Sequence, residues 1–450
     1  MASNTKSMTS GTPGKLIFLF AIPLMLGNIF QQLYTVVDTM VVGQVLGVGA
    51  LAALGATDWT NWMMLGIIQG FTQGFSIRIA QDFGAGNVKG IRKDITTSVI
   101  LAAVLAMILL IFGQLFLYPL LHVMQTPDDV MGNAILYLRI MFAGIPIVMA
   151  YNMLASILRA FGDGKSPLYA MIIACIINIV LDILFVAFWG LGIAGAAVAT
   201  LIAQCCSAIY CMSALRKIRM IKLERGDWKM DKELGFSLMK LGFPMAFQNA
   251  IISVGGMIVQ SVVNGFGVLF IAGFTATNKL YGVLEVAATS YGYAMVTYAG
   301  QNLGAGKLDR IKKGLRAAIL VAIFTSAVIS ICMLIFGKNI LALFISGTPQ
   351  EIQATLEIAY RYLAIMSYCL LILYFLHIYR STLQGLGDTV LPMVSGIAEF
   401  VMRTGAAVLL PRLIGSDGIF YAEICAWTGA DIILISAYYI RMHKLEKSRE

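Results

Sequence analysis

The chain is patterned as a series of long apolar runs that are separated by short polar connectors. An apolar run of about 20 residues is long enough to cross the hydrocarbon core of a bilayer as a helix. The weak alternating segments of about ten residues that mark a membrane β-barrel do not occur in the sequence. The pattern therefore predicts about twelve membrane-spanning helices, at residues 15–42, 50–80, 94–121, 132–160, 166–189, 191–214, 236–264, 270–300, 314–337, 352–383, 389–411 and 416–441.

The composition supports the same conclusion. The 450 residues are 59% hydrophobic and only 12% charged, whereas soluble globular proteins carry about 25% charged residues. A chain with so few charges cannot cover a water-facing surface, so the bilayer must be its main solvent. The polar segment at residues 1–15 lacks the short apolar region and the small-residue cleavage site of a signal peptide, so we expect the first apolar run to be a permanent span.

The basic residues indicate how the chain is oriented. The formal net charge is +9, and Lys and Arg gather in the connectors that follow even-numbered spans, most clearly at residues 89–93, 216–232 and 307–313. Basic connectors mark the cytoplasmic side of a membrane, where they are attracted to anionic lipid. We therefore predict a multi-pass protein of the cell inner membrane with both termini in the cytoplasm, and contact with membrane lipids instead of nucleic acid.

Cysteine and histidine usage gives no sign of a resident metal or of another cofactor. The seven cysteines lie inside apolar runs without CxxC spacing, and the three histidines are far apart in the sequence. This pattern predicts free, buried thiols instead of a disulfide or metal framework. The sequence also lacks a Walker motif, so we do not expect ATP to drive the protein directly.

The second half of the chain repeats the first about 220 positions later. The sequence Gln-Asp-Phe-Gly-Ala-Gly at residues 81–86 corresponds to Gln-Asn-Leu-Gly-Ala-Gly at residues 301–306, and a basic connector follows each copy. Each copy holds about six spans, an even number, so both copies start on the same side and their pseudo-two-fold axis runs along the membrane normal. We predict a cytoplasmic tail at residues 1–14, an N-lobe of six spans at 15–214, a basic cytoplasmic linker at 215–235, a C-lobe of six spans at 236–441 and a cytoplasmic tail at 442–450.

Two aspartates of the first half lie inside apolar runs, Asp38 in the first span and Asp182 in the fifth. An ionised side chain in hydrocarbon costs at least several kcal/mol, so an acid at this depth is a candidate functional residue. Helical spacing puts Tyr34 on the same face as Asp38, and it puts Asn178 on the same face as Asp182.

Together with Asn152 in the fourth span and Thr200 in the sixth, these residues offer carboxylate, amide and hydroxyl oxygens. A small hard cation such as Na⁺ takes several oxygen ligands. Two carboxylates in a low-dielectric interior can equally hold a shared proton. Alternatively, these groups only hydrogen-bond the helices together. The residues alone leave all three interpretations open.

The second half carries Glu285, Glu399 and Glu423 within its apolar runs. Arg403 follows Glu399 by one helical turn, so we expect this pair to neutralise itself locally. Glu285 has no partner that is evident from the sequence, and it is a candidate for lining a cavity. The seventh span contains amides but no acid, so an acidic ion site belongs to the first half.

A wall that accommodates varied organic molecules needs adaptable side chains. Thioethers repack around irregular ligands, and aromatic faces attract organic cations. The chain has 25 methionines and 18 tyrosines, although such residues are also common in helix cores. The candidate substrate-cavity residues are Gln32, Tyr281, Glu285, Tyr291, Met295 and Tyr368.

Three features carry a resemblance to one known family: the doubled Gly-Ala-Gly loops, the layout of six plus six spans, and the first-span residues Pro23, Asn28, Gln32, Leu33, Tyr34, Asp38, Val42 and Gly43. Over nearly its whole length the chain resembles a MATE (multidrug and toxic compound extrusion) transporter. The resemblance implies a V-shaped pair of six-helix lobes that exports cationic or amphipathic small molecules in exchange for Na⁺ or H⁺. In prokaryotic members with an N-lobe ion site, the ligating residues resemble Asp38, Asn178, Asp182 and Thr200 here, with Tyr34 and Asn152 nearby.

Two similar lobes with a seam between them favour alternating access, and no filter loop or ring of charges indicates a channel. We expect small organic cations or amphipathic drugs as substrates, H⁺ or Na⁺ as the coupling ion, and function as a monomer. One alternative is a lipid-linked oligosaccharide flippase of the same superfamily, although such a protein needs a cationic cavity and Arg403 is the main intramembrane arginine. Another alternative is an intramembrane enzyme in which Asp38 and Asp182 form an aspartyl dyad.

Overall fold

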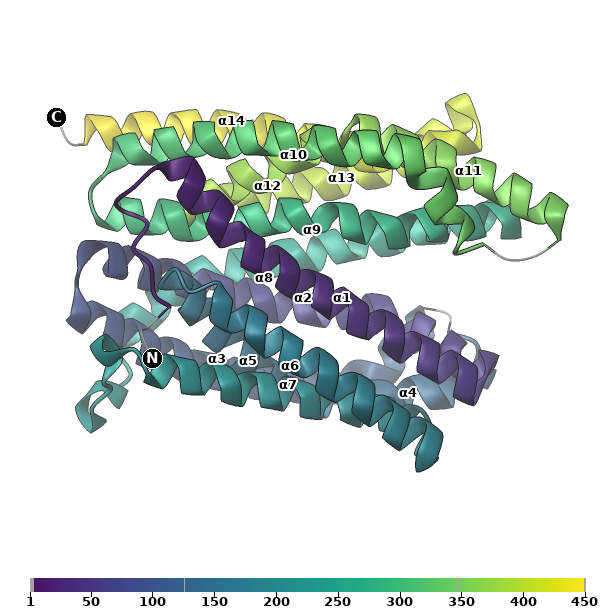
Figure 1. Ribbon diagram of the computed structural model, residues 1–450, viewed down its shortest axis with the longest axis horizontal. Helices are drawn as coiled ribbons and strands as arrows, with labels where there is room; N and C mark the ends of the chain where they lie inside the picture. The colour runs from purple at the N-terminus through teal and green to yellow at the C-terminus, as the bar shows by residue number, and fades with distance from the viewer. Residues whose placement is uncertain (1–3, 125, 346–347, 449–450) are drawn as a thin grey trace. The chain divides into compact units, whose positions relative to one another are not determined.

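The computed structural model describes residues 4–124, 126–345 and 348–448, and these residues form helices with no strand among them (Figure 1). The α-helices are α1 (Pro13–Leu46), α2 (Val48–Ala85), α3 (Val88–Val123), α4 (Asp128–Ala143), α5 (Ile145–Ala160), α6 (Lys165–Asp182), α7 (Gly192–Arg216), α8 (Lys232–Val263), α9 (Val268–Gly304), α10 (Leu308–Ala342), α11 (Pro349–Tyr368), α12 (Leu370–Gly385), α13 (Val390–Ile414) and α14 (Ala422–Lys447). A π-helical segment η1 (Ile183–Phe188) continues α6, and the short 3₁₀ segments are η2 (Arg219–Ile221), η3 (Arg225–Trp228), η4 (Asn264–Phe266) and η5 (Ser416–Tyr421).

Each of the twelve predicted spans coincides with a helix or with consecutive helical segments. Among the described residues, eight helices are long and apolar enough to cross a membrane, and the bent pairs α4–α5 and α11–α12 raise the number to ten. The other two predicted spans are α2 and α9. They have 38 and 37 residues, but they are too polar to be counted among these apolar helices. The protein is therefore an all-helical, multi-pass membrane protein, with eight to ten spans by length and composition where the sequence pattern predicts about twelve.

Two predicted spans, 132–160 and 352–383, are bent instead of continuous. The helices α4 and α5 meet at Gly144 with a bend of 49°, and α11 and α12 meet at Cys369 with a bend of 50°. Pro146 accounts for the first bend, because a proline in the first turn of α5 has no N–H for a continuing helix and its ring collides with the preceding turn. Nothing in the described structure explains the break at Cys369.

The internal repeat is visible in the structure. The two bends fall at corresponding places in the two copies. Gly86 and Gly306 follow the corresponding helices α2 and α9 with φ of 71° and 72°, a left-handed conformation that glycine adopts without steric cost. The N–H of the next residue donates to the carbonyl oxygen five residues earlier, at 3.0 Å after Gly86 and at 2.8 Å after Gly306. The repeated Gly-Ala-Gly loop is thus a helix-terminating turn.

The chain forms two compact units. Unit 1 consists of Met1–Met8 and Ile22–Ala246, and unit 2 consists of Thr9–Ala21 and Phe247–Glu450. Of the three points at which the chain passes between units, one precedes α1, one lies within α1 and one lies within α8. The N-lobe, linker and C-lobe boundaries drawn from the sequence stay a prediction.

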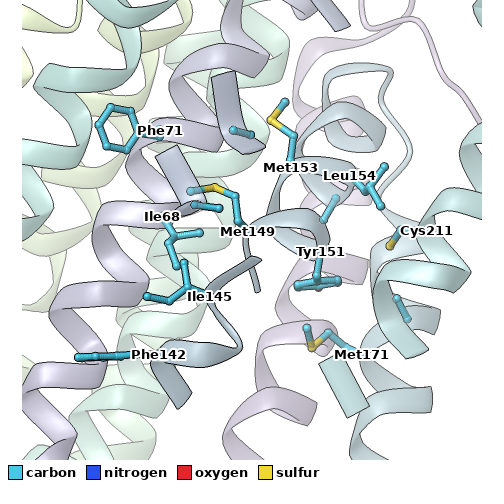
Figure 2. Close-up of a cluster of buried hydrophobic side chains, with 14 of the residues drawn as sticks. Ile68, Phe71, Phe142, Ile145, Met149, Tyr151, Met153, Leu154, Met171 and Cys211 are labelled. Atoms are coloured by element: carbon cyan, nitrogen blue, oxygen red, sulfur yellow. The ribbon is translucent and has the colours of Figure 1, made fainter. Parts of the chain in front are cut away.

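One helix lies at the centre of each unit. In unit 1, α5 packs against α2, α3 and α7, and most of its side chains are buried. Figure 2 shows Met149 and Leu154 of α5 between Ile68 of α2 and Cys211 of α7, within one continuous apolar core. In unit 2, the corresponding helix α12 is also mostly buried, and it packs against α9, α10 and α14.

The outer helices expose large apolar side chains. Phe112, Leu115 and Phe116 of α3 are each more than half exposed, and so are Leu320 and Phe324 of α10. A soluble monomer rarely exposes apolar surface on this scale, whereas a helix that faces lipid does so without cost. These faces are where the protein meets the bilayer.

Two glycines of α2 allow α8 to approach closely. A methyl group at Gly70 would collide with the backbone of Ala246, and a methyl group at Gly74 would lie 2.5 Å from the Cα of Gly242. All four residues belong to unit 1. Small residues spaced by four let helix backbones pack closely, and in lipid such packing holds helices together.

The substitution Gly70→Ala is expected to lower the melting temperature of the purified protein, because overpacking a close contact costs about 1–3 kcal/mol. Gly55→Ala on the same helix is the matched control. A methyl group there meets nothing within 4 Å, and alanine favours a helix over glycine. An unchanged melting temperature for Gly70→Ala would mean that α2 and α8 do not pack this closely.

Candidate functional site

The predicted cation-binding residues lie on three helices of unit 1. Asp38 is on α1, and Thr200 is on α7. Asn178 and Asp182 are one turn apart on α6, which packs along α7. Asp38 is only 6% exposed, and both α6 residues are fully buried. An acid buried this deeply in an apolar bundle needs a compensating partner or a bound cation.

The structure brings these side chains into one region. The Asn178 side-chain N–H donates to the Thr200 hydroxyl at 3.3 Å and links α6 to α7. The carboxyl groups of Asp38 on α1 and Asp182 on α6 lie within electrostatic reach of each other. Side chains from three helices therefore converge, as the sequence predicts, while their function as ligands stays a prediction.

This region is rich in oxygens that no hydrogen bond satisfies. Within the described part of the chain, Asp38 Oδ1, Asn178 Oδ1 and both carboxylate oxygens of Asp182 are buried without a hydrogen-bond partner. Each unsatisfied acceptor costs about 1–3 kcal/mol, and a charged one costs more. A cation or protons at this position would remove much of that cost. Carboxylate, amide and hydroxyl oxygens are the donors that a hard cation takes.

The backbone changes its winding directly after Asp182. The α-helix α6 gives way to the π-helical segment Ile183–Phe188, in which the Trp189 N–H donates to the carbonyl oxygen of Leu184 at 2.9 Å. Such wide turns inside helices are uncommon and occur frequently at functional sites. No feature of the sequence predicts this segment, which begins directly after Asp182.

The two residues predicted to support the site have different hydrogen-bond partners. Tyr34 is buried one turn before Asp38 on α1, and its hydroxyl accepts a hydrogen bond from the Gln204 side chain at 3.3 Å. Asn152 is also buried, but its side-chain N–H donates to the carbonyl oxygen of Val148 in its own helix at 2.9 Å. Tyr34 therefore joins neighbouring helices at the site, while the bond from Asn152 stays within α5.

Sequence reasoning missed three residues near the site. Gln204 follows Thr200 by one turn of α7, so helical spacing was a usable signal. Tyr137 of α4 lies within electrostatic reach of both Asp38 and Asp182. Asp58 of α2 interacts with Asp38 in the same way. The sequence does not show which helices pack together, so it gave no reason to connect the last two with the site.

Arginines neutralise two glutamates inside unit 2. Arg403 Nη2 lies 3.0 Å from Glu399 Oε1, which confirms the pair expected from helical spacing. Arg380 of α12 adds a second contact to Glu399 at 2.6 Å, and Arg403 also contacts Glu423 of α14 at 2.7 Å. Two arginines and two glutamates thus form one buried network that joins α12, α13 and α14.

The structure shows two features of unit 2 that the sequence does not reveal. Glu285 has a partner, because His377 Nε2 lies 3.4 Å from Glu285 Oε1. Arg403 is not the only deeply placed arginine of this unit, since Arg380 is 8% exposed. In both cases the partners sit on different helices, so spacing along the chain does not reveal them.

The proposed substrate-cavity residues fall into different environments. Tyr291 and Met295 are fully buried in the packing of unit 2, and the Tyr291 hydroxyl lies 2.9 Å from the Thr325 hydroxyl. Tyr281 stacks on Trp427 with ring centroids 6.0 Å apart. By contrast, Tyr368 is 74% exposed, while Gln32 and Glu285 are half-buried. Their contact with a substrate stays a prediction.

Comparison with known proteins identifies the class. A model of the family described as MatE matches the chain twice, at residues 23–184 and at residues 244–409, once in each half. The protein is a membrane transporter and not an enzyme. It belongs to the MATE family, as the sequence resemblance indicates, and the alternative of an intramembrane aspartyl enzyme is wrong.

Relatives match the chain along most of its length. The probable multidrug resistance protein YoeA of Bacillus subtilis (strain 168) is 32% identical over 432 residues, which are 94% of this chain and 92% of that protein. The FAD transporter of Shewanella oneidensis is 25% identical over 357 residues, which are 77% of each chain. The relatives thus include proteins named for multidrug resistance and one named for a nucleotide cofactor.

Solved structures share the fold. A MATE transporter in complex with MaL6 matches with a TM-score of 0.90 at 22% identity, over 98% of both chains. A MOP superfamily transporter from Pyrococcus furiosus, described as having a binding pocket of reverse polarity, matches with a TM-score of 0.90 at 23% identity, also over 98% of both chains. At this identity the likeness establishes the fold of the chain.

Breaking the network of unit 2 is expected to be costly. Arg403→Met removes the charge and keeps the length of the side chain, which leaves Glu399 and Glu423 without their shared partner. Removing one partner of a buried pair costs about 3–5 kcal/mol. Thermal unfolding of the purified protein measures this loss.

The matched control for that experiment is Arg361→Met, since Arg361 pairs with Asp417 at 2.6 Å but is half exposed. An exposed ion pair contributes about 0–1 kcal/mol. Equal shifts in melting temperature for the two variants would contradict a buried network at Arg403.

Proposed function

We propose that this transporter is a secondary active antiporter that exports cationic or amphipathic small organic molecules in exchange for H⁺ or Na⁺. The observation that carries the proposal is the group of buried oxygens around Asp38 and Asp182, which have no hydrogen-bond partner among the described residues. Carboxylates in this position are stable only when a cation neutralises them. A site that must be refilled by a cation can couple transport to an ion gradient.

Coupling would work by mutual exclusion. A cation that enters from outside neutralises Asp38 and Asp182 and favours the state that releases the substrate. The empty carrier then returns, loses the cation to the cytoplasm and binds substrate again. Only a difference in affinity between the two states can drive this cycle, so the cation-bound state must bind substrate more weakly.

The helix that carries Asp38 has a point at which it can bend. Pro23 lies inside α1, fifteen residues before the aspartate. A proline within a helix removes one backbone hydrogen bond and favours a kink there. Neutralising Asp38 would change its electrostatic interaction with Asp182 of α6, and the bend would transmit the change along α1.

The charge balance of unit 2 favours a cationic cargo. Arg380 and Arg403 are both held by glutamates, while Glu285 and Asp431 add two further carboxylates to the same cluster. Carboxylates therefore outnumber the arginines in this cluster. FAD, which the Shewanella relative is named for, and the pyrophosphate of a lipid-linked oligosaccharide would instead require positive charge that glutamates do not neutralise. The flippase alternative is correspondingly less well supported.

We also propose that the protein resides in the inner membrane as a monomer, with both termini in the cytoplasm. The support is the concentration of Lys and Arg in the connectors after even-numbered spans. Protease cleavage of the basic linker in inverted vesicles, but not in intact cells, is the result that agrees with this orientation.

Asp38→Asn is expected to reduce export of a fluorescent organic cation from proteoliposomes to the level of protein-free vesicles. The amide keeps the shape of the side chain but has no negative charge to be neutralised by the coupling cation. Na⁺ and pH gradients are imposed separately, and FAD is added as a competitor to test for an anionic cargo.

Asp129→Asn is the control for that assay, because Asp129 is exposed at the start of α4. It should retain the wild-type rate, and both variants should insert normally into the membrane. If purified Asp38→Asn transports at the wild-type rate, or if FAD alone blocks export of the cation by being carried in its place, the proposed function is wrong.

A further inference from the structure

We propose that Gln204 supplies an additional oxygen ligand to the coupling cation, and that this ligand makes the site in unit 1 prefer Na⁺ to a proton. The proposal rests on the proposed function for the position of the site. It goes further in naming the coupling ion and a residue that selects it.

The position of the Gln204 amide leaves its oxygen available. The residue is 7% exposed on α7, and its Nε2 donates to the Tyr34 hydroxyl at 3.3 Å. This bond fixes the amide nitrogen toward α1. The remaining atom, Oε1, is buried and has no hydrogen-bond partner within the described residues. A buried amide oxygen without a donor costs about 1–3 kcal/mol unless something else satisfies it.

The neighbours of Gln204 belong to the predicted cation site. Tyr34, to which it is bonded, precedes Asp38 by one turn of α1. Thr200 precedes Gln204 by one turn of α7 and accepts the hydrogen bond from Asn178. Residues four apart on a helix share a face, so Gln204 points to the same side of α7 as the Thr200 hydroxyl. Its free oxygen therefore belongs to the same polar region.

The type of oxygen determines whether it strengthens the binding of Na⁺ or of a proton. A proton bonds to one carboxylate oxygen and is shared with at most one further acceptor. An amide oxygen is not protonated near neutral pH, so it offers a proton only a weak secondary contact. A hard metal cation instead draws on several oxygens at once. Each additional neutral oxygen therefore favours Na⁺ over H⁺.

A count of the buried oxygens points the same way. Five of them have no hydrogen-bond partner in the described structure: Asp38 Oδ1, Asn178 Oδ1, Asp182 Oδ1, Asp182 Oδ2 and Gln204 Oε1. No three His, Cys, Asp or Glu side chains among the described residues are grouped closely enough to hold a metal. A metal cation here would thus depend on amide and hydroxyl oxygens beside the carboxylates, which gives Gln204 a defined role.

Competition between Na⁺ and protons depends on the titratable groups around the site. These are Asp38 and Tyr34 on α1, Asp58 on α2, Tyr137 on α4, and Cys175 and Asp182 on α6. None of them is a base with a fixed positive charge. The region as a whole is therefore selective for cations, and the neutral oxygens determine which cation binds best.

The rival explanation is that Gln204 only positions Tyr34. In that case, removing the Tyr34 hydroxyl and removing the Gln204 amide would reduce the affinity for Na⁺ equally. A double variant would then lose no more affinity than either single variant. If Gln204 is a ligand, its loss must reduce the affinity for Na⁺ more than the loss of the hydroxyl does. The two roles are therefore separable by measurement.

The experiment is equilibrium binding of ²²Na⁺ to the purified full-length protein at several pH values, without transport. Gln204→Leu keeps a side chain of similar size and removes the oxygen, Gln204→Glu keeps an oxygen, and Tyr34→Phe removes only the hydroxyl. Gln204→Leu should weaken Na⁺ binding about tenfold or more, which corresponds to about 1.4 kcal/mol. Gln204→Glu should retain Na⁺ binding, and Tyr34→Phe should weaken it much less than Gln204→Leu.

In proteoliposomes, Gln204→Leu should reduce export driven by a Na⁺ gradient much more than export driven by a pH gradient. Wild-type Na⁺ affinity in Gln204→Leu would overturn the proposal, and so would equal, non-additive losses in Gln204→Leu and Tyr34→Phe. If Gln204→Leu does not fold, Gln204→Glu decides instead, because Na⁺ binding as weak as in Asp38→Asn would exclude an oxygen ligand at this position. Failure of the proposed function is separate, since it appears as unchanged Na⁺ binding and transport in Asp38→Asn.

Discussion

A carboxylate buried in hydrocarbon must be neutralised, and the two units of this chain meet that constraint in different ways. In unit 2 the neutralising charges are part of the protein, because Arg380 and Arg403 surround Glu399. In unit 1, no described lysine or arginine pairs with Asp38 or Asp182, and Asp38 Oδ1 and both carboxylate oxygens of Asp182 are buried without a hydrogen-bond donor. A fixed counter-charge stabilises a fold, whereas a missing one creates a place for a mobile cation.

The duplicated scaffold explains how the two units can differ so much in chemistry. Both copies have a bend in the fourth span and a left-handed glycine after the second, at Gly86 and Gly306. These features follow from backbone geometry and apolar packing, which the repeat preserves. The acids of the candidate site, Asp38 and Asp182, lie on α1 and α6 in unit 1, whereas the acids that arginines hold in unit 2, Glu399 and Glu423, lie on α13 and α14. Helix positions are thus shared, while polar side chains have diverged toward separate tasks.

Much of this architecture could be predicted from the sequence, for identifiable reasons. Apolar runs of membrane length located the helices, and the Gly-Ala-Gly motif revealed the repeat. Spacing within one helix predicted the pair of Glu399 and Arg403, because residues four apart face the same side. The partners that were missed, Arg380 and His377, contact acids on other helices. Such contacts depend on helix packing, which cannot be read from a single sequence. The break at Cys369 could not be predicted either, because no proline or glycine lies at that position.

Infrared titration of the carboxyl groups in the purified protein tests the central claim most directly. In Na⁺-free buffer near neutral pH, the account predicts an absorption band from a protonated carboxylic acid that is lost in the Asp38→Asn, Asp182→Asn double variant. Adding Na⁺ should diminish that band, as the metal cation replaces protons among the buried oxygens. Two carboxylates that stay fully ionised in the absence of Na⁺ would contradict the account, because no described residue supplies the charge that would stabilise them.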